Sequence, residues 1–349
     1  MRNFYFLKYF RKFLLVLLLF AFSTSISFSQ ITSKGRDFWM GFMLNYQTTY
    51  STHNLYLYLS SDSVSNVVVT IPGLNWSRNL ILQPNIADTI KLPSNAVTTS
   101  SRVVSNFGVR ITSDQDINCF AMNYKKATTD GTIILPNNAL GSDYYVLSTY
   151  LGTNGLSEFL IVSNQNNTQI TFITPQNQTT TITLNQGQTY LVTSSIDLTG
   201  TRVFSPSGQN FALFTGNTCE NIPGNVSACD HLYEQLFPVN TWGNEYIIVP
   251  LWGIDTVTRN PIARNSTYKI FSSSNNTNVL LNNTPLVNFS AGQSFLFNNR
   301  NFFHLSSNNP IQVAQFSQGQ KNGDRVLSDP FMIMVSQTYQ KRKTVSFVS

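Results

Sequence analysis

The sequence has 349 residues, with 22 basic and 16 acidic residues and a net charge of +6. Four of the basic residues lie within the first twelve positions. The remainder has 18 basic and 16 acidic residues, a net charge of +2. The basic character therefore predicts no nucleic-acid partner, because no cluster of Lys and Arg interleaved with aromatic residues occurs along the chain.

Residues 1–29 are predicted to be a signal peptide. A basic start precedes an apolar run at residues 13–22, which is shorter than the roughly 20 residues of a membrane-spanning helix. The Ser-Phe-Ser triplet at 27–29 is a small-x-small cleavage site that places Gln30 at the mature N-terminus. The mature chain, which has no later apolar span, is expected to be secreted or held at the cell surface. The alternative is an uncleaved N-terminal anchor.

The composition favours an all-β fold. Ser, Thr and Asn are abundant, Lys and Glu are scarce, and aromatic residues are common, which disfavours helix and suits strands joined by polar turns. Short alternating segments such as LYLYL at 55–59, VVVTI at 67–71 and IQVAQF at 311–316 fit a pleated surface with one buried face. No run of a dozen residues keeps a helical period.

A repeated spacing predicts three tandem β-sandwich-like modules of about 100 residues each. Pro136 precedes Gly141 by five residues and Tyr144 by eight, and the same spacing begins again at Pro238. A more diverged first copy begins at Gly35. The glycines of the three copies are 106 and then 102 residues apart, a length that suits one antiparallel sandwich per copy.

These spacings predict the organisation of the chain. We expect β modules at 30–132, 133–218 and 236–335, and a Cys-bounded linker loop at 219–235 that holds one short helical turn between the second and third modules. Residues 336–349 are expected to form a basic tail. The sequence ends within an apolar-polar alternation, which predicts that the chain is truncated or a fragment of a longer protein.

The cysteines indicate one disulfide. Cys219 and Cys229 enclose nine residues, and in an exported chain this spacing predicts a local bridge, with two buried free thiols as the alternative. Cys119 lies in an alternating strand without a basic partner nearby in sequence, so it is expected to be a buried, unreactive thiol.

The linker also carries the polar residues that suggest chemistry. The spacing of Asp230–Leu236 predicts the helical turn, with Asp230 as its cap. His231 and Glu234 would share one face of such a turn, but two ligands do not make a metal site, so a structural histidine is favoured. A thiol protease is disfavoured, because a disulfide would consume Cys229 and adjacent side chains rarely converge.

Sugar chemistry is the other alternative. The four glutamates have no glycosidase motif around them, although paired carboxylates for sugar hydrolysis stay open as a possibility. Trp76, Trp242 and Trp252 are candidates for stacking on sugars. Because Trp242 lies within the repeated pattern, core or interface packing is favoured at that position.

One set of residues in this region follows the spacing of a known signature: Cys229, Asp230, His231, Glu234, Gln235, Pro238, Trp242, Gly243 and Tyr246. This pattern resembles the N-terminal domain of IgG Fc-binding proteins, and GRDFW at 35–39 resembles the family's opening strand. The signature residues are interpreted as structural, and the leader and composition are typical of a bacterial member. In the family this domain usually precedes further modules.

The resemblance implies a secreted or cell-surface adhesion or ligand-binding module that is not an enzyme and needs no cofactor or metal. Its expected partner is an extracellular glycoprotein or polysaccharide. Fc binding itself is not carried over, because no contact residue for IgG can be mapped onto the signature. The alternatives are an accessory β region of an extracellular polysaccharide-acting enzyme and a structural stalk or surface-layer element.

Overall fold

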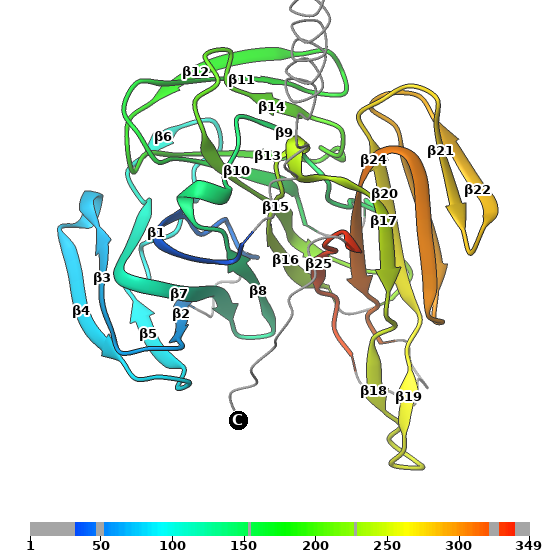
Figure 1. Ribbon diagram of the computed structural model, residues 1–349, viewed down its shortest axis with the longest axis horizontal. Coiled ribbons are helices and arrows are strands. Elements are labelled where there is room, and N and C mark those ends of the chain that lie inside the picture. Colours follow the sequence, from blue (N-terminus) through cyan, green and yellow to red (C-terminus); the bar gives the residue numbers. More distant parts are fainter. Residues whose placement is uncertain (1–31, 47–51, 153–154, 227–228, 321–327, 339–349) are drawn as a thin grey trace, which may run out of the picture. The chain divides into compact units, whose positions relative to one another are not determined.

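The computed structural model describes residues 32–46, 52–152, 155–226, 229–320 and 328–338. All of them belong to one compact unit, Ile31–Ser349. Strands and three short 3-10 turns make up its regular structure (Figure 1), which confirms the all-β prediction. The predicted signal peptide and residues 339–349 of the predicted basic tail lie outside the described residues.

The first sheet has seven antiparallel strands, in the order β4-β3-β7-β2-β5, with β1 and β8 also paired to β7. Strand β2 shows why the sequence folds this way: its leucines at 55, 57 and 59 are buried, whereas the tyrosines between them are partly exposed. The strands are β1 (Lys34–Met40), β2 (Asn54–Ser61), β3 (Ser65–Ile71), β4 (Trp76–Leu82), β5 (Asp88–Leu92), β7 (Val109–Lys125) and β8 (Thr128–Ile134), with the 3-10 turn η1 at Pro72–Leu74.

The middle of the chain forms two sheets, with orders β16-β15-β10-β13-β6 and β12-β11-β14-β9. Strands β10 and β15 are buried along their whole length, so neither shows the alternation of a half-exposed strand. The elements are β6 (Val104–Ser105), η2 (Asn137–Ala139), β9 (Asp143–Tyr145), β10 (Ser157–Ser163), β11 (Thr168–Ile173), β12 (Thr179–Leu184), β13 (Thr189–Ser194), β14 (Arg202–Phe204), β15 (Phe211–Glu220) and β16 (Asp230–Gln235).

The last part forms a seven-stranded sheet in the order β22-β21-β24-β20-β23, with β17 and β25 also paired to β24. A separate two-stranded ribbon, β18–β19, leaves this sheet between β17 and β20. The elements are η3 (Val239–Thr241), β17 (Gly243–Ile248), β18 (Trp252–Ile254), β19 (Pro261–Ala263), β20 (Ser266–Ser272), β21 (Thr277–Leu281), β22 (Thr284–Phe289), β23 (Ser294–Asn299), β24 (Phe303–Ser317) and β25 (Met332–Met334).

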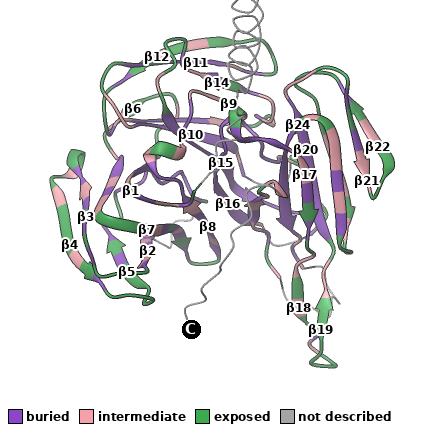
Figure 2. Ribbon diagram, in the orientation of Figure 1, coloured by how far each residue is buried: buried purple, intermediate pink, exposed green. Residues whose placement is uncertain are grey.

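The buried hydrophobic residues form two clusters. All buried residues, polar ones included, are purple in Figure 2. One cluster runs through the first sheet and both middle sheets and also includes residues of the last sheet such as Phe271 and Met332, and the other lies within the last sheet. Two sheets also cross the expected module boundaries. Strand β6 pairs with β13 of the second module, and β8 spans the expected boundary between residues 132 and 133. The exact boundaries therefore remain predictions.

The repeated glycines have matching surroundings. Gly141 donates its backbone N–H to the hydroxyl of Tyr144 at 2.8 Å, and this hydroxyl donates to the carbonyl of Phe211 at 2.8 Å. Gly243 and Tyr246 repeat the first of these bonds at 3.2 Å, and the hydroxyl of Tyr246 repeats the second by donating to the carbonyl of Ile311. A further shared feature is an acidic side chain two residues after each glycine that pairs with a basic side chain on a neighbouring strand: Asp37 with Arg110, Asp143 with Arg202, and Glu245 with His304.

Close approach explains the glycines of the first two copies. A Cβ added at Gly35 would lie 2.3 Å from Cβ of Pro136, and one added at Gly141 would lie 2.4 Å from Cβ of Pro238. Real Cβ atoms essentially never come so near a neighbour, so a side chain at either position would force the following turn away.

The expected helical turn at Asp230–Leu236 is wrong. Residues 230–235 form strand β16, so the linker loop is shorter than the predicted 219–235 and lies between the ends of β15 and β16. All six residues of β16 are buried, because neighbouring strands cover both of its faces, and its polar residues therefore follow no strand period. The short helical turn lies slightly later, at η3.

Candidate functional site

The signature strand β16 lies where three sheets meet. It is the edge strand of its five-stranded sheet, and β8 and β25 each pair only with the long strand, β7 or β24, of their own sheets. Strand β16 lies against both β8 and β25 near the centre of Figure 1. Along the part of the chain that the structure describes, no backbone ladder joins β16 to either of them.

Asp130 of β8 connects the three strands. Its Oδ2 accepts the backbone N–H of Tyr233 on β16 at 3.0 Å and that of Met332 on β25 at 3.2 Å. Its Oδ1 accepts the N–H of Gly131 at 2.8 Å. One carboxyl group therefore satisfies edge-strand donors that would otherwise be buried without a partner.

Glu234 makes the same kind of connection from β16. One of its carboxyl oxygens accepts the hydroxyl of Thr132 on β8, and the other accepts the backbone N–H of Met334 on β25 at 3.2 Å. The next side chain, Gln235, accepts the N–H of Leu135 at 2.8 Å. We call Asp130, Thr132, Glu234 and Gln235 the junction residues, because their side chains replace a backbone ladder between the three sheets.

Asp230 connects the first residue of β16 to β8. Its Oδ1 accepts the backbone N–H of Thr129 at 2.5 Å and that of His231 at 2.8 Å. The side chain thus serves a strand edge and not the first turn of a helix, which corrects the expected cap.

Burial shifts the titration of these acids. Desolvation raises the pKa of Glu234 to about 8 and the pKa of Asp230 to about 7. The pKa of Asp130 is also raised well above its ordinary value, first by burial and further by the nearby Glu234. Glu234 is therefore mostly protonated at neutral pH, and the junction holds fewer charges than its sequence implies.

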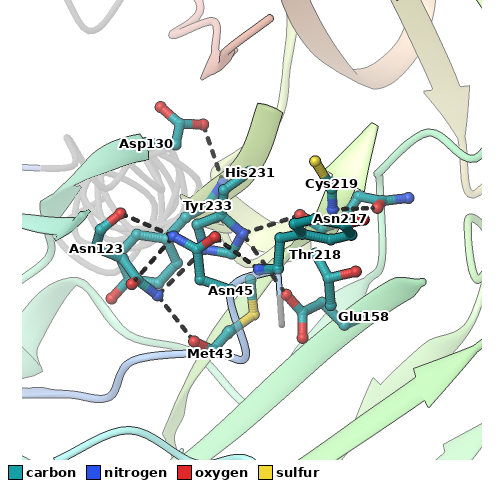
Figure 3. Close-up of polar contacts among 12 residues, drawn as sticks. Met43, Asn45, Asn123, Asp130, Glu158, Asn217, Thr218, Cys219, His231 and Tyr233 are labelled. Atoms are coloured by element: carbon teal, nitrogen blue, oxygen red, sulfur yellow. Dashed lines mark hydrogen bonds and ion pairs between the residues drawn. The ribbon is translucent and has the colours of Figure 1, made fainter. Parts of the chain in front are cut away.

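His231 is fully buried, and Figure 3 shows its polar contacts. Its Nδ1 lies 2.9 Å from the carbonyl of Asn217, and its Nε2 lies 3.2 Å from the side-chain amide nitrogen of Asn123. These partners fit a ring that donates from Nδ1 and accepts at Nε2. Burial lowers the pKa of His231 to about 3, so the ring carries no charge at physiological pH.

Glu158 lies next to this ring, with Oε1 4.0 Å from Nδ1 of His231. Both side chains are fully buried, and burial raises the pKa of Glu158 well above its ordinary value. Burial therefore favours the neutral form of both groups. Neither side chain reaches solvent.

The metal alternative fails on geometry. His231 and Glu234 are three residues apart on a strand, so their side chains leave opposite faces and contact different neighbours. Within the described ranges, no group of three or more His, Cys, Asp and Glu side chains is arranged to hold a metal ion.

The cysteine predictions are confirmed. Cys219 and Cys229 form a disulfide, and Cys119 is a buried free cysteine whose pKa is raised by burial. The bridge joins the end of β15 to the residue before β16, so it closes the hairpin that presents the signature strand. It also occupies the sulfur that a thiol protease would need.

The remaining signature residues pack around η3. Trp242 is buried, its indole N–H donates to the carbonyl of Phe237 at 3.1 Å, and its ring lies beside Tyr145 and Phe271 with centroids 6.1 and 6.0 Å away. Packing in the core is therefore confirmed at this position. Pro238 lies against Gly141, and Gly243 begins β17. Trp252, by contrast, is exposed.

Sequence reasoning missed the partners of β16 in the first sheet. Asp130 and Thr132 are about 100 residues away in sequence, and they occupy buried positions of a strand whose third inward-facing polar residue, Thr128, is buried as well. The available signal was this run of polar residues at inward positions of an alternating strand. It indicates a buried polar contact without identifying its partner.

These features define an all-β protein whose signature residues build a buried junction between sheets. The family model of the IgGFc binding protein matches residues 130–349, a range that begins at the aspartate joining the three strands. The chain belongs to the IgGFc-binding protein family. It is 26% identical over 328 residues to the human IgGFc-binding protein. The aligned region covers 87% of this chain and 6% of the human protein. The chain thus spans a small fraction of that relative's length.

Among solved structures, the chain has a faint likeness to one described as "Structural insight into host cell surface retention of a 1.5-MDa bacterial ice-binding adhesin". The likeness has 8% identity and a TM-score of 0.14, covering 80% of this chain and 87% of that chain, which is too low to indicate a shared fold. Among the described residues, no helix is long and apolar enough to cross a membrane.

Proposed function

We propose that this chain is an exported, non-catalytic module that binds an extracellular ligand and acts in adhesion at the cell surface. Family membership supports a binding role, since the human relative is named for binding IgG Fc. The disulfide supports an oxidising compartment, where such bonds form and persist. The leader at residues 1–29 supports export.

One observation carries the non-catalytic part of the proposal. The residues with the most suggestive chemistry, His231 and Glu234, are buried and bonded to other strands, so they have a structural task that explains their presence. Reading them as a catalytic pair would require both to leave these contacts and meet a substrate.

The proposed ligand is a glycoprotein or a polysaccharide. The chain has few charged residues and many Asn, Thr and Ser, so its contacts are expected to rely on hydrogen bonding and stacking more than on electrostatic steering. Loop ends of the sheets are the expected contact surface, because a rigid scaffold leaves them free to vary.

The test is a binding screen combined with turnover assays. The chain, purified from an oxidising compartment, is immobilised and exposed to IgG Fc, to other glycoproteins and to polysaccharides, and the same samples are assayed for hydrolysis. Saturable binding without turnover supports the proposal. Hydrolysis that disappears in Glu234→Gln or His231→Gln, with the fold intact by circular dichroism, would overturn it.

A further inference from the structure

Two surface recesses lie at equivalent places in the first two copies of the repeated spacing. Their volumes are similar, about 380 Å³ in the first copy and about 360 Å³ in the second. Each lining includes a glycine, an acid two residues later and an asparagine of the next 3-10 turn: Gly35, Asp37 and Asn138 in the first recess, and Gly141, Asp143 and Asn240 in the second. The recess therefore belongs to the repeated unit and is not an accident of one loop.

The two asparagines lie in the same relation to their glycines. Each is the middle residue of its 3-10 turn, and its Oδ1 would be 3.8 Å from a Cβ added at Gly35 or 3.5 Å from one added at Gly141. Both asparagines are exposed, and no hydrogen bond joins either amide group to another residue in the described part of the chain. Each recess thus has an amide group that can donate from nitrogen and accept at oxygen.

An arginine holds the acid of each recess in place. Nε and Nη2 of Arg110 lie 3.0 and 3.2 Å from the two carboxylate oxygens of Asp37, and those of Arg202 lie 3.0 and 2.9 Å from those of Asp143. The two aspartate side chains are still 36% and 35% exposed. Because at least one oxygen of each acid keeps a lone pair, both acids can accept a hydrogen bond from a ligand without leaving their arginines.

The charges of the recesses favour a neutral ligand. The two acids are balanced by their arginines, and the cations Lys34 and Arg36 at the first recess are paired with Asp62 and Asp116. A cationic ligand gains little from carboxylates that are already balanced, and an anionic ligand would lie against them. Polar side chains make up seven of the nine lining residues in the first recess and four of the seven in the second, so an apolar ligand would leave polar groups without partners.

We propose that the two recesses are equivalent subsites for neutral sugar units of an extracellular glycan. Each hydroxyl group of a sugar ring both donates and accepts, so one hydroxyl can donate to the aspartate while another accepts from the asparagine amide. Two subsites on one chain let a polymer of repeated sugars bind at both, which raises its affinity above that of a single sugar. This assignment rests on the proposed function and narrows its ligand to neutral glycans.

Binding of the full chain, purified from an oxidising compartment, to immobilised probes tests the proposal. The probes are neutral glucans, mannans and galactans, anionic alginate, and the glycoprotein ribonuclease B beside its unglycosylated form, ribonuclease A. The last pair distinguishes the glycan of a glycoprotein from a free polysaccharide and from a protein surface. We expect saturable binding to a neutral glycan and none to alginate or ribonuclease A. Asn138→Ala and Asn240→Ala should each lower the affinity for the polysaccharide about tenfold, and the double variant should abolish binding.

Asn79→Ala on β4 is the matched control, because it removes an exposed asparagine outside both recesses and should bind like the parent. All three positions are exposed, so the melting temperature of each variant should be nearly unchanged. Glycan binding that persists undiminished in the double variant would overturn the subsites and leave the proposed function standing. Binding only to alginate or to ribonuclease A would overturn the neutral-sugar class. Absence of binding to every probe would overturn the subsites, and the proposed function falls with them only if IgG Fc and the other glycoproteins of the earlier screen also fail to bind.

Discussion

Asp130 and Tyr233 are 103 residues apart, yet the carboxylate of the first accepts the backbone N–H of the second at 3.0 Å. The same oxygen accepts the N–H of Met332, so a single side chain touches the edge strands of two other sheets. Strand edges are normally joined by backbone ladders, and here side chains perform that task. The junction depends on a small number of replaceable groups, which makes it testable.

Removing the carboxyl group of Asp130 should lower the stability of the fold. Asp130→Ala leaves the backbone N–H groups of Tyr233 and Met332 buried without an acceptor, and each such group costs about 1–3 kcal/mol. We expect the free energy of unfolding to fall by about 3 kcal/mol, measured by urea titration. Asp130→Asn is the control, because its amide oxygen can still accept both bonds, and it should lose less than half as much.

Stability should fall as the pH rises above neutral. The pKa of Glu234 is raised from 4.5 to about 8 in the folded state, so the stability it contributes is full below pH 4.5 and is lost as the pH rises through 8. Asp230, with a pKa of about 7, acts in the same direction. The melting temperature should therefore decline between pH 6.5 and 9.

Glu234→Gln tests the cause of that decline. Glutamine has the shape of the protonated acid and can still bond Thr132 and Met334, so this variant should lose less stability than the parent over the same pH range. A decline of equal steepness in both proteins would show that Glu234 does not titrate as argued.

Stability should also fall in acid, for the opposite reason. Burial lowers the pKa of His231 to about 3 and that of His53 to about 4, both from 6.5. Each ring contributes stability that is present above pH 6.5 and is lost as the pH falls through the folded value. Together with the acids, these shifts predict a maximum in melting temperature on the acidic side of neutral. A maximum above pH 8 would contradict both assignments.

Strands exposed on one face were the predictable part of the fold. In β2, alternation marks the strand because solvent covers one of its faces. Strand β16 is covered on both faces, so its sequence carries no strand period and resembles a helical turn. The spacing of Cys219 and Cys229 predicted their bridge, because a local loop brings them together whatever the rest of the chain does.

The junction was not predictable from one sequence. Asp130 meets Tyr233 only after three sheets have formed and docked, and no local pattern records which edges meet. The sequence predicted a structural role for the signature residues. In the structure, His231 has hydrogen-bonding partners on both ring nitrogens. Their partners are set by tertiary contacts that sequence periodicity does not describe.

Breaking the disulfide should loosen the hairpin that carries β16. Cys229→Ser opens a loop with a sequence separation of 10, for which the chain-entropy model predicts a loss of about 3 kcal/mol, and often less in practice. Thiol labelling with intact-mass measurement checks the redox state first. One thiol should react in denaturant before reduction and three after it, and Cys119 should resist labelling in the native protein because it is buried.

Lys269 ties the last sheet to the middle of the chain. Its ammonium nitrogen lies 2.7 Å from the carboxylate of Asp197 and 2.8 Å from both the carbonyl of Ser148 and the hydroxyl of Thr199. Lys269→Met keeps most of the volume but removes the donor from all three acceptors. We expect a loss of about 2 kcal/mol in the free energy of unfolding, reduced because Asp197 can regain water.

An exposed ion pair is the control for that experiment. Arg36 lies 2.7 Å from Asp116, with both side chains 59% exposed, so Arg36→Met should change the free energy of unfolding by only about 0.5 kcal/mol or less. If the two methionine variants lost the same stability, burial of Lys269 would not be the source of its effect.

The repeated glycine–tyrosine contact gives the last prediction. The hydroxyl of Tyr144 accepts the N–H of Gly141 and donates to the carbonyl of Phe211, both at 2.8 Å, and the ring is fully buried. Tyr144→Phe should leave both backbone groups without a partner and cost about 2 kcal/mol, by urea titration. Tyr145→Phe makes the same change on the neighbouring residue, whose hydroxyl is outside this arrangement, and should cost much less. The first copy carries Phe38 at the corresponding position, so the substituted ring itself fits such a site. Equal losses in the two variants would mean that the hydroxyl of Tyr144 does not hold the start of β9 against β15.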